Sequence, residues 1–163
     1  LLSAGGGHAM AAGFTCTVDS LPAFRTFLEE RVSRHVATNG AGLGLHIDGM
    51  LEAGGATLEL VRDIARLGPF GSGNGEPRFV FSGLRVARAD PGGTAHVRCT
   101  LAGATGGRLA GIAFRCMDRP LGQALMDRAG APLHVAGRLN ENVWQGRSSV
   151  QLVIDDVAPA HLA

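Results

Sequence analysis

The sequence predicts an α+β segment in its first half followed by an all-β region. Apolar residues recur at helical spacing in two stretches of the first half, whereas five β-rich segments follow one another from Arg78 onward. A short helical stretch separates the third β-rich segment from the fourth. Five strands with a helix at that position is the arrangement of an OB-fold barrel. A β-sandwich can contain the same number of strands, but the position of the helix favours the barrel.

The first half is expected to alternate strands and helices. Phe24 and Phe27 lie in the first helical stretch, where an aromatic pair is typical of a core. Pro69 ends the second helix, and the glycine-rich loop after it predicts irregular structure. The expected elements are a strand over residues 14–18, a helix over 21–36, a strand over 45–51 and a helix over 57–67.

The second half is expected to contain the barrel. Pro91, Gly92 and Gly93 predict a turn after the first strand, and Gly106 and Gly107 a turn after the second. Of Phe79, Phe81 and Phe114, at least two are expected in the core. The expected strands span residues 79–88, 95–102, 108–116, 132–144 and 149–157, with the helix over 121–130.

Composition excludes some classes of function. No apolar run approaches the roughly 20 residues that span a bilayer, so no membrane partner is expected. All 15 basic residues are arginine. Residues 1–77 carry five arginines against eight acidic residues, and residues 78–163 carry ten against six. A basic second half fits a nucleic-acid surface, although a mixed solvated surface explains so modest an excess as well.

The cysteines and histidines indicate neither disulfides nor a metal site. Cys16, Cys99 and Cys116 are odd in number, lack CxxC spacing and lie in apolar stretches, so buried free thiols in a cytoplasmic protein are expected. The six histidines show no HxxxH or HExxH spacing, and no metal ligands are expected in this chain.

The stretch from Gly5 to Phe14, GGGHAMAAGF, is the most distinctive motif. Glycines let the backbone approach a ligand closely, and successive free N–H groups that lead into a helical turn can hold an anion such as phosphate. His8 stands where its side chain could reach that anion. A glycine-rich turn that only joins two strands is the alternative.

The order of residues adds a family resemblance. GGGHAMAAGF resembles the GGGHxxAAGF motif of the DHH-associated domain, the second domain of the DHH phosphodiesterases. PFGSGNGEPRF, from Pro69 to Phe79, resembles the PFGxGNPEPxF segment of the RecJ family of single-stranded-DNA-specific exonucleases, although Gly75 stands where that family usually has proline. The resemblance continues through AHVRCTL, LAGIAFR, RLNENVWQGR and VQLVIDDVAP, and so covers nearly all of the chain.

The resemblance implies three parts of a longer protein. Residues 1–40 correspond to the C-terminal part of the DHH-associated domain, residues 41–77 to a connecting strand-helix segment with the PFGSGN loop, and residues 78–163 to the OB-fold domain. The start of the chain lacks a methionine and lies beside the glycine motif, so the chain is expected to be the C-terminal piece of its parent.

The resemblance also implies an activity for the parent, 5′→3′ digestion of single-stranded DNA in repair and recombination. Gly5, Gly6, Gly7 and His8 would bind the substrate phosphate, with His8 catalytic. Mn²⁺ or Mg²⁺ would be bound by the first domain, because this chain has no Asp-His-His triplet. The chain alone is therefore expected to bind no metal and to be inactive. Its expected partners are single-stranded DNA, the absent catalytic domain and, through exposed apolar surface, a second copy.

An OB fold binds single strands with a basic groove and aromatic platforms. Trp144 is expected at a hairpin tip, where it either stacks a base or covers the end of the barrel, and Phe114 is a second candidate aromatic. The candidate nucleic-acid-binding residues are Arg85, Arg88, Arg98, Arg115, Arg138, Trp144 and Arg147.

Two other functions fit parts of the sequence. Other DHH phosphodiesterases share the glycine motif and act on oligoribonucleotides or cyclic dinucleotides, but the PFGSGNGEP loop and the added OB region argue against them. An OB region can also serve as a protein-interaction scaffold, in which case its arginines are incidental.

Overall fold

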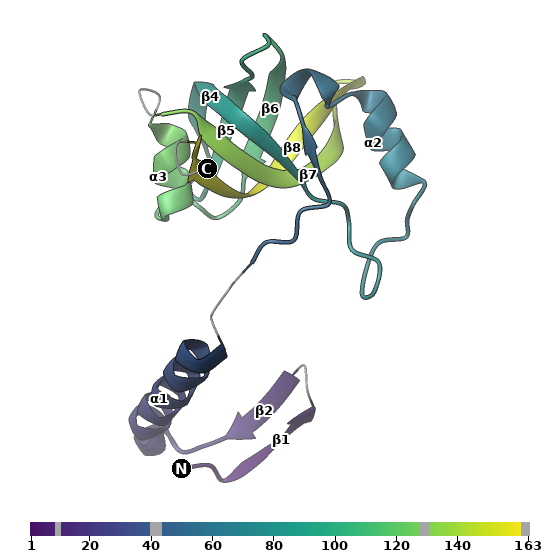
Figure 1. Ribbon diagram of the computed structural model, residues 1–163. Helices are drawn as coiled ribbons and strands as arrows, with labels where there is room; N and C mark the ends of the chain where they lie inside the picture. Colours follow the sequence, from purple (N-terminus) through teal and green to yellow (C-terminus); the bar gives the residue numbers. More distant parts are fainter. Residues whose placement is uncertain (9–10, 40–43, 128–130, 161–163) are drawn as a thin grey trace. The chain divides into compact units, whose positions relative to one another are not determined.

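The structure, a computed structural model, describes residues 1–8, 11–39, 44–127 and 131–160. The chain divides into two compact units, residues 1–45 and residues 46–163 (Figure 1). Within the described ranges, none of the helices combines the length and the apolar character that crossing a membrane would require.

The N-terminal unit is a β-hairpin followed by a helix (Figure 1). The two strands pair antiparallel, and a short 3₁₀ helix leads into the long helix, which extends beyond the residue 36 expected from the sequence. The elements are β1 (Ala4–His8), β2 (Ala11–Thr15), η1 (Val18–Ser20) and α1 (Leu21–Asn39).

The three glycines of the motif lie inside strand β1. The expectation that they form a turn leading into a helical turn is therefore wrong, and they do not merely join two strands either. Gly7 lies opposite Ala12 in the hairpin, and a Cβ on Gly7 would be 2.6 Å from the carbonyl oxygen of Ala11. The close approach of the two strands accounts for glycine at this position.

An aromatic contact joins the hairpin to the helix. The rings of Phe14 and Phe24 lie 4.5 Å apart, and Phe24 is only 6% exposed. The expected core position is confirmed for Phe24 but is wrong for Phe27, which is 43% exposed and lies under the guanidinium of Arg31. Several other apolar residues of α1 are also exposed, namely Leu21, Leu28, Val32 and Val36.

In its described residues, the C-terminal unit contains a six-stranded sheet, two α-helices and a short 3₁₀ helix (Figure 1). Each of the five expected β-rich segments contains a strand, and the expected helix lies between the third and the fourth of them. The elements are β3 (Gly49–Leu51), η2 (Ala53–Gly55), α2 (Leu58–Ala65), β4 (Phe79–Gly92), β5 (His96–Ala102), β6 (Arg108–Ala113), α3 (Pro120–Met126), β7 (Leu133–Trp144) and β8 (Arg147–Pro159).

Several boundaries differ from the expectation; for example, β2 ends at Thr15 and not at residue 18, and β6 ends at Ala113 and not at residue 116. Strand β4 continues through Pro91 and Gly92, which were expected in a turn. The strand expected over residues 45–51 is reduced to β3, because side-chain and backbone bonds hold the residues before it. The N–H of Arg78 donates to the carboxylate of Asp48 at 2.8 Å, and the guanidinium of Arg78 donates to the carbonyl of His46 at 3.2 Å.

The strands pair in the order β3-β4-β5-β6-β8-β7, and β4 also pairs with β7. The pairing thus returns from β7 to β4, while β3 lies outside this ring as a parallel neighbour of β4. Helix α3 packs against β4, β5 and β8, and α2 packs against β7 and β8. An ion pair of 3.0 Å between Arg62 and Glu141 joins α2 to β7 and lowers the pKa of Glu141.

The core lies inside this ring of strands. Inward residues alternate with outward ones, and the fully buried side chains include Phe81, Leu84, Leu101 and Leu152. Phe79 is partly buried against the same cluster, so two of the three phenylalanines pack there as expected, whereas Phe114 is exposed.

The three cysteines are free thiols. Cys99 and Cys116 are buried as expected, and burial raises the pKa of Cys99 to about 12 and also raises the pKa of Cys116. Cys16 is only partly buried, so the expectation of burial is wrong for this residue.

Candidate nucleic-acid interface

The outer face of β4, β5 and β6 carries a cluster of arginines. Because Leu109 and Leu101 point inward, their neighbours Arg108 and Ala102 point outward, and the register places these two opposite each other. Arg85 on β4 pairs with Ala102 from the other side. The register therefore brings Arg85 and Arg108 to the two sides of the central strand β5.

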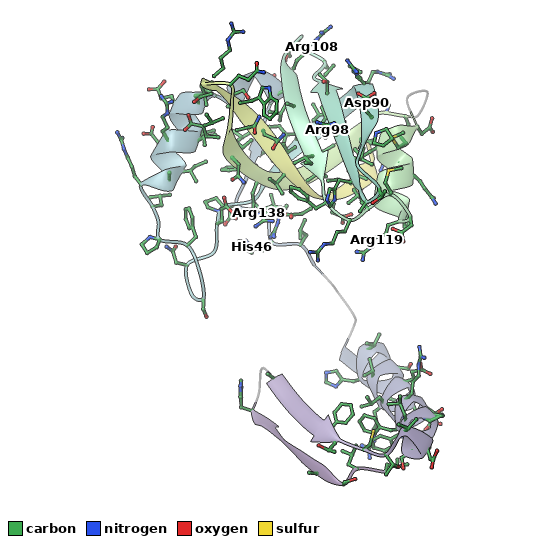
Figure 2. The ribbon with its side chains drawn as sticks, turned by 180° about the vertical axis from the view of Figure 1, so that it is seen from behind. His46, Asp90, Arg98, Arg108, Arg119 and Arg138 are labelled. Atoms are coloured by element: carbon green, nitrogen blue, oxygen red, sulfur yellow. The ribbon has the colours of Figure 1, made fainter. Side chains whose placement is uncertain are left out.

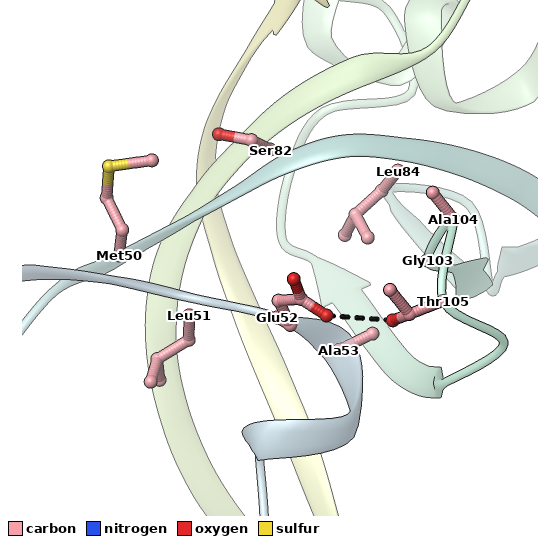
Figure 3. A pocket seen from close by; sticks show the side chains of 9 residues that line it. All are labelled: Met50, Leu51, Glu52, Ala53, Ser82, Leu84, Gly103, Ala104 and Thr105. Carbon is pink, nitrogen blue, oxygen red and sulfur yellow. Dashed lines mark hydrogen bonds between the residues drawn. The ribbon is translucent and has the colours of Figure 1, made fainter.

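A second row of this face lies further along the same strands. Arg88 of β4 lies opposite Thr100 of β5, and Asp90 lies opposite Arg98. Arg88, Asp90, Arg98 and Thr100 line a hollow of about 480 Å³. Figure 2 shows Asp90, Arg98 and Arg108 over this part of the sheet.

The charge of this face is positive. The carboxylate on this face is that of Asp90, which accepts a hydrogen bond of 2.6 Å from the Nε of Arg88. Arg85, Arg98 and Arg108 form no ion pair with any residue that the structure describes. We call Arg85, Arg88, Arg98 and Arg108 the strand-face arginines. Arg108 is not among the candidates predicted from the sequence, although the alternation of apolar residues in 108–113 places it on the outward face.

The β7–β8 hairpin adds an exposed aromatic ring. Trp144 and Arg147 are paired across the tip, and the two residues between them, Gln145 and Gly146, have φ values of 47° and 73°. Positive φ at both central residues is typical of a type I′ turn. Trp144 is 71% exposed and Arg147 is exposed as well, so the indole does not cover the end of the sheet.

Arg138, another candidate, is engaged within the fold. Its guanidinium donates to Asp155 at 3.0 Å and to Glu76 at 3.4 Å, and these bonds raise its pKa. Arg78 donates to the same Asp155 at 2.7 Å. The carboxylate thus joins β8 to β7 and to the residue that precedes β4.

Replacing Asp155 with asparagine is expected to destabilise the fold by about 1–3 kcal/mol, since two half-buried guanidinium groups would lose their shared anion. Urea unfolding measures this change. Asp156→Asn is the matched control, because Asp156 is exposed, and it is expected to change the unfolding free energy by no more than about 0.5 kcal/mol. Equal effects of the two substitutions would show that Asp155 has no special structural role.

The glycine motif lies in the other unit. His8 is the last residue of β1 and is exposed. A Cβ on Gly6 would meet no atom within 4 Å, and on Gly5 none closer than 3.8 Å. One edge of β1 pairs with β2, so the backbone of this strand is accessible from its other edge.

A metal centre does not fit the described part of the chain. Among its residues no three of the His, Cys, Asp and Glu side chains gather in a group that could hold an ion. His46 and Asp48 approach each other at 3.5 Å, but the histidine is highly exposed and Asp48 caps the N–H of Arg78.

Comparison with known proteins identifies the C-terminal unit. The family model described as the RecJ OB domain matches residues 47–156. The chain belongs to the RecJ OB domain family. This finding confirms the resemblance noted in the sequence, and it confirms an OB domain built from a β-rich sheet and a helix. The matched residues include segment 47–77, which the sequence analysis had assigned to a connection.

Full-length relatives and solved structures agree with this assignment. The chain is 30% identical to the single-stranded-DNA-specific exonuclease RecJ of Escherichia coli over 94% of its own length and 26% of the relative. It is 29% identical to that of Thermus thermophilus, over 93% of the chain and 20% of the relative. The crystal structure of Thermus thermophilus RecJ with Mn²⁺ matches with a TM-score of 0.62 at 26% identity, over 97% of this chain and 22% of that one. The chain thus spans about a fifth to a quarter of the length of the curated relatives that it matches.

Proposed function

We propose that this chain is the part of a RecJ-like single-strand-specific exonuclease that binds single-stranded DNA. The observation that carries the proposal is the row of strand-face arginines, three of which form no ion pair with a described residue. Arginine suits phosphate contacts because its guanidinium presents a fixed fork of donors. The outer face of adjacent strands is where an OB domain binds oligonucleotides.

We also propose that the ring β4-β5-β6-β8-β7 is the five-stranded OB barrel, with β3 an additional edge strand. The pairing of β4 with β7 supports this proposal, as does the position of α3 between the third and fourth strands of the ring. In this division, residues 46–163 form the OB part and residues 1–45 the end of a DHH-associated domain. The exposed apolar residues of α1 support packing of the N-terminal unit on the rest of the longer protein, or on a second copy.

Trp144 is proposed to stack a base of the bound strand. Trp144→Ala is expected to weaken binding of a dT oligomer by about 5- to 150-fold, which corresponds to 1–3 kcal/mol per stacked base. Fluorescence anisotropy of a labelled oligomer measures the change. Because Val143 is also exposed at the same hairpin, Val143→Ala is the control and should bind as the native chain does. Equal weakening by both variants would contradict a stacking role.

For the longer protein, exonuclease activity with Mn²⁺ or Mg²⁺ held outside this chain is proposed, because the solved relatives are described as complexes with those ions. Gly5, Gly6, Gly7 and His8 would then contact the substrate phosphate. The open edge of β1 supports this role, since backbone N–H groups on that edge are accessible, and His8 is exposed at the end of the same strand. His8 is proposed to be catalytic.

In the longer protein, His8→Ala is expected to reduce turnover by about 100-fold or more, in the range of a lost positioning or acid–base group. Binding of single-stranded DNA should remain within about twofold, because the OB unit is unchanged. Turnover and affinity are measured on the same preparation, with His35→Ala on α1 as the histidine control. Turnover equal to that of the native protein would show that His8 is not part of the catalytic site.

A further inference from the structure

A second basic hollow lies beyond the end of β6. It has a volume of about 230 Å³, and its lining includes Phe114, Arg115, Arg119, Arg138 and Asp155. Figure 2 labels Arg119 and Arg138 at the edge of the unit away from Arg108. Arg119 is not among the candidates predicted from the sequence, whereas Phe114 and Arg115 are.

The charge of the hollow is unbalanced. Three guanidinium groups line it together with one carboxylate, that of Asp155. Asp155 is already bonded to Arg78 and Arg138, at 2.7 Å and 3.0 Å. Arg115 and Arg119 form no ion pair with any described residue, so the hollow offers two cationic groups to an anion.

Backbone bonds hold the segment that carries these groups. Arg115 has a φ of 51°, and its N–H donates to Nδ1 of His96 at 2.9 Å. The N–H of Cys116 donates to the carbonyl of Ala95 at 2.8 Å, and the N–H of Arg119 donates to the carbonyl of Cys116 at 2.9 Å. The backbone of this segment is therefore already held in place, which limits the conformational entropy that the backbone loses when a ligand binds.

Gly122 shows how closely this segment packs. A Cβ at Gly122 would overlap the carbonyl oxygen of Cys116, so α3 can lie against the segment only with glycine there. The positions of Arg115 and Arg119 therefore follow from the packing of α3 on the end of β6.

Phe114 provides an aromatic surface at the same place. Its ring contacts His96 edge to face, with centroids 5.1 Å apart and an interplanar angle of 78°. Phe114 nevertheless remains 52% exposed. An exposed ring held by an aromatic neighbour beside unpaired guanidinium groups can bind a planar group that carries a phosphate.

The hollow continues from the strand-face arginines. Ile112 of β6 lies opposite Arg98 of β5, and Phe114, two residues later and just past the end of β6, contacts the ring of His96 at the start of β5. Val153 of β8, which lies opposite Ile112 on its other side, also lines the hollow. A strand that follows Arg98 along this face would thus reach Phe114 next.

We propose that this hollow binds one nucleotide of a single strand, with its base stacked on Phe114 and its phosphate between Arg115 and Arg119. The inference rests on the proposed single-strand binding and adds a defined subsite to it. Base stacking requires the ring, whereas the phosphate contact requires only the arginines. The two contributions can therefore be separated by an oligomer that lacks bases.

The test uses the 163-residue chain with a dT oligomer and an abasic oligomer of the same length, both followed by fluorescence anisotropy. Phe114→Ala is expected to weaken dT binding by about 5- to 150-fold and to leave abasic binding unchanged. Arg119→Gln is expected to weaken the binding of both oligomers. It should also reduce the magnitude of the slope of log affinity against log salt concentration by about 0.7. Arg66→Gln is the charge control, because Arg66 follows α2 and pairs with Asp63.

Several results would overturn the inference. If Phe114→Ala weakens the binding of both oligomers equally, or of neither, the ring does not stack a base. The proposed function would still stand in that case if the native chain binds the dT oligomer and Arg98→Gln loses this binding. If poly-aspartate displaces the oligomer from the native chain but not from Arg119→Gln, the hollow is a site for acidic protein segments instead. If the native chain binds no single strand, the proposed function fails together with the subsite.

Discussion

Replacing Arg85, Arg88, Arg98 and Arg108 together with glutamine is expected to weaken single-strand binding on the order of 100-fold. Three of these side chains form no ion pair with a described residue, and the fourth, Arg88, pairs with Asp90. Each lost phosphate contact should reduce the magnitude of the slope of log affinity against log salt concentration by about 0.7, so the total reduction should be about 3. Anisotropy titrations at several salt concentrations measure both quantities.

The matched control removes the same charge elsewhere. Arg25, Arg31, Arg34 and Arg66 lie on or just after the helices α1 and α2, and their joint replacement with glutamine alters net charge equally. This variant is expected to keep its affinity within about threefold, because long-range charge effects on exposed groups are screened by salt. Similar losses in the two variants would show that binding follows net charge and not the strand face.

Phe81→Ala is expected to destabilise the OB unit by about 3–5 kcal/mol. The side chain is fully buried, and β4 places it between Leu51 of β3 and Val135 of β7. Its loss would leave a cavity where three strands meet. Because domains of this size have a total stability of about 5–15 kcal/mol, the variant should lie close to unfolding.

Urea unfolding, followed by far-ultraviolet circular dichroism, measures the effect of Phe81→Ala. Phe114→Ala is the control for loss of an aromatic ring, because Phe114 is 52% exposed, and it should cost less than about 1 kcal/mol. Phe81→Leu should recover most of the stability, since it restores much of the volume. A loss for Phe81→Ala as small as that of the control would contradict the position of the core.

The strands of the second half could be predicted because one face of each is buried. In residues 96–102 the buried Val97, Cys99 and Leu101 alternate with outward residues, and this period of two is visible in the sequence. The position of α3 followed from the helical spacing of Leu121, Leu125 and Met126. These patterns are local, so no tertiary information was needed to find them.

Other features depend on partners far away in the sequence. No residue near Arg138 in the sequence indicates that its guanidinium pairs with Asp155 and Glu76, which lie 17 and 62 residues away. The glycines of β1 favour a turn by their conformational freedom, but pairing with β2 makes them a strand. The subsite around Phe114 and Arg119 arises only when α3 packs on the end of β6.

Binding of the 163-residue chain to a single-stranded DNA oligomer, measured across a salt series with duplex DNA as the control, tests the central claim most directly. The account predicts a clear preference for the single strand, with affinity that falls steeply as salt increases. No binding, or equal binding to the duplex, would contradict it, and would mean that the strand-face arginines and Trp144 do not form a single-strand interface.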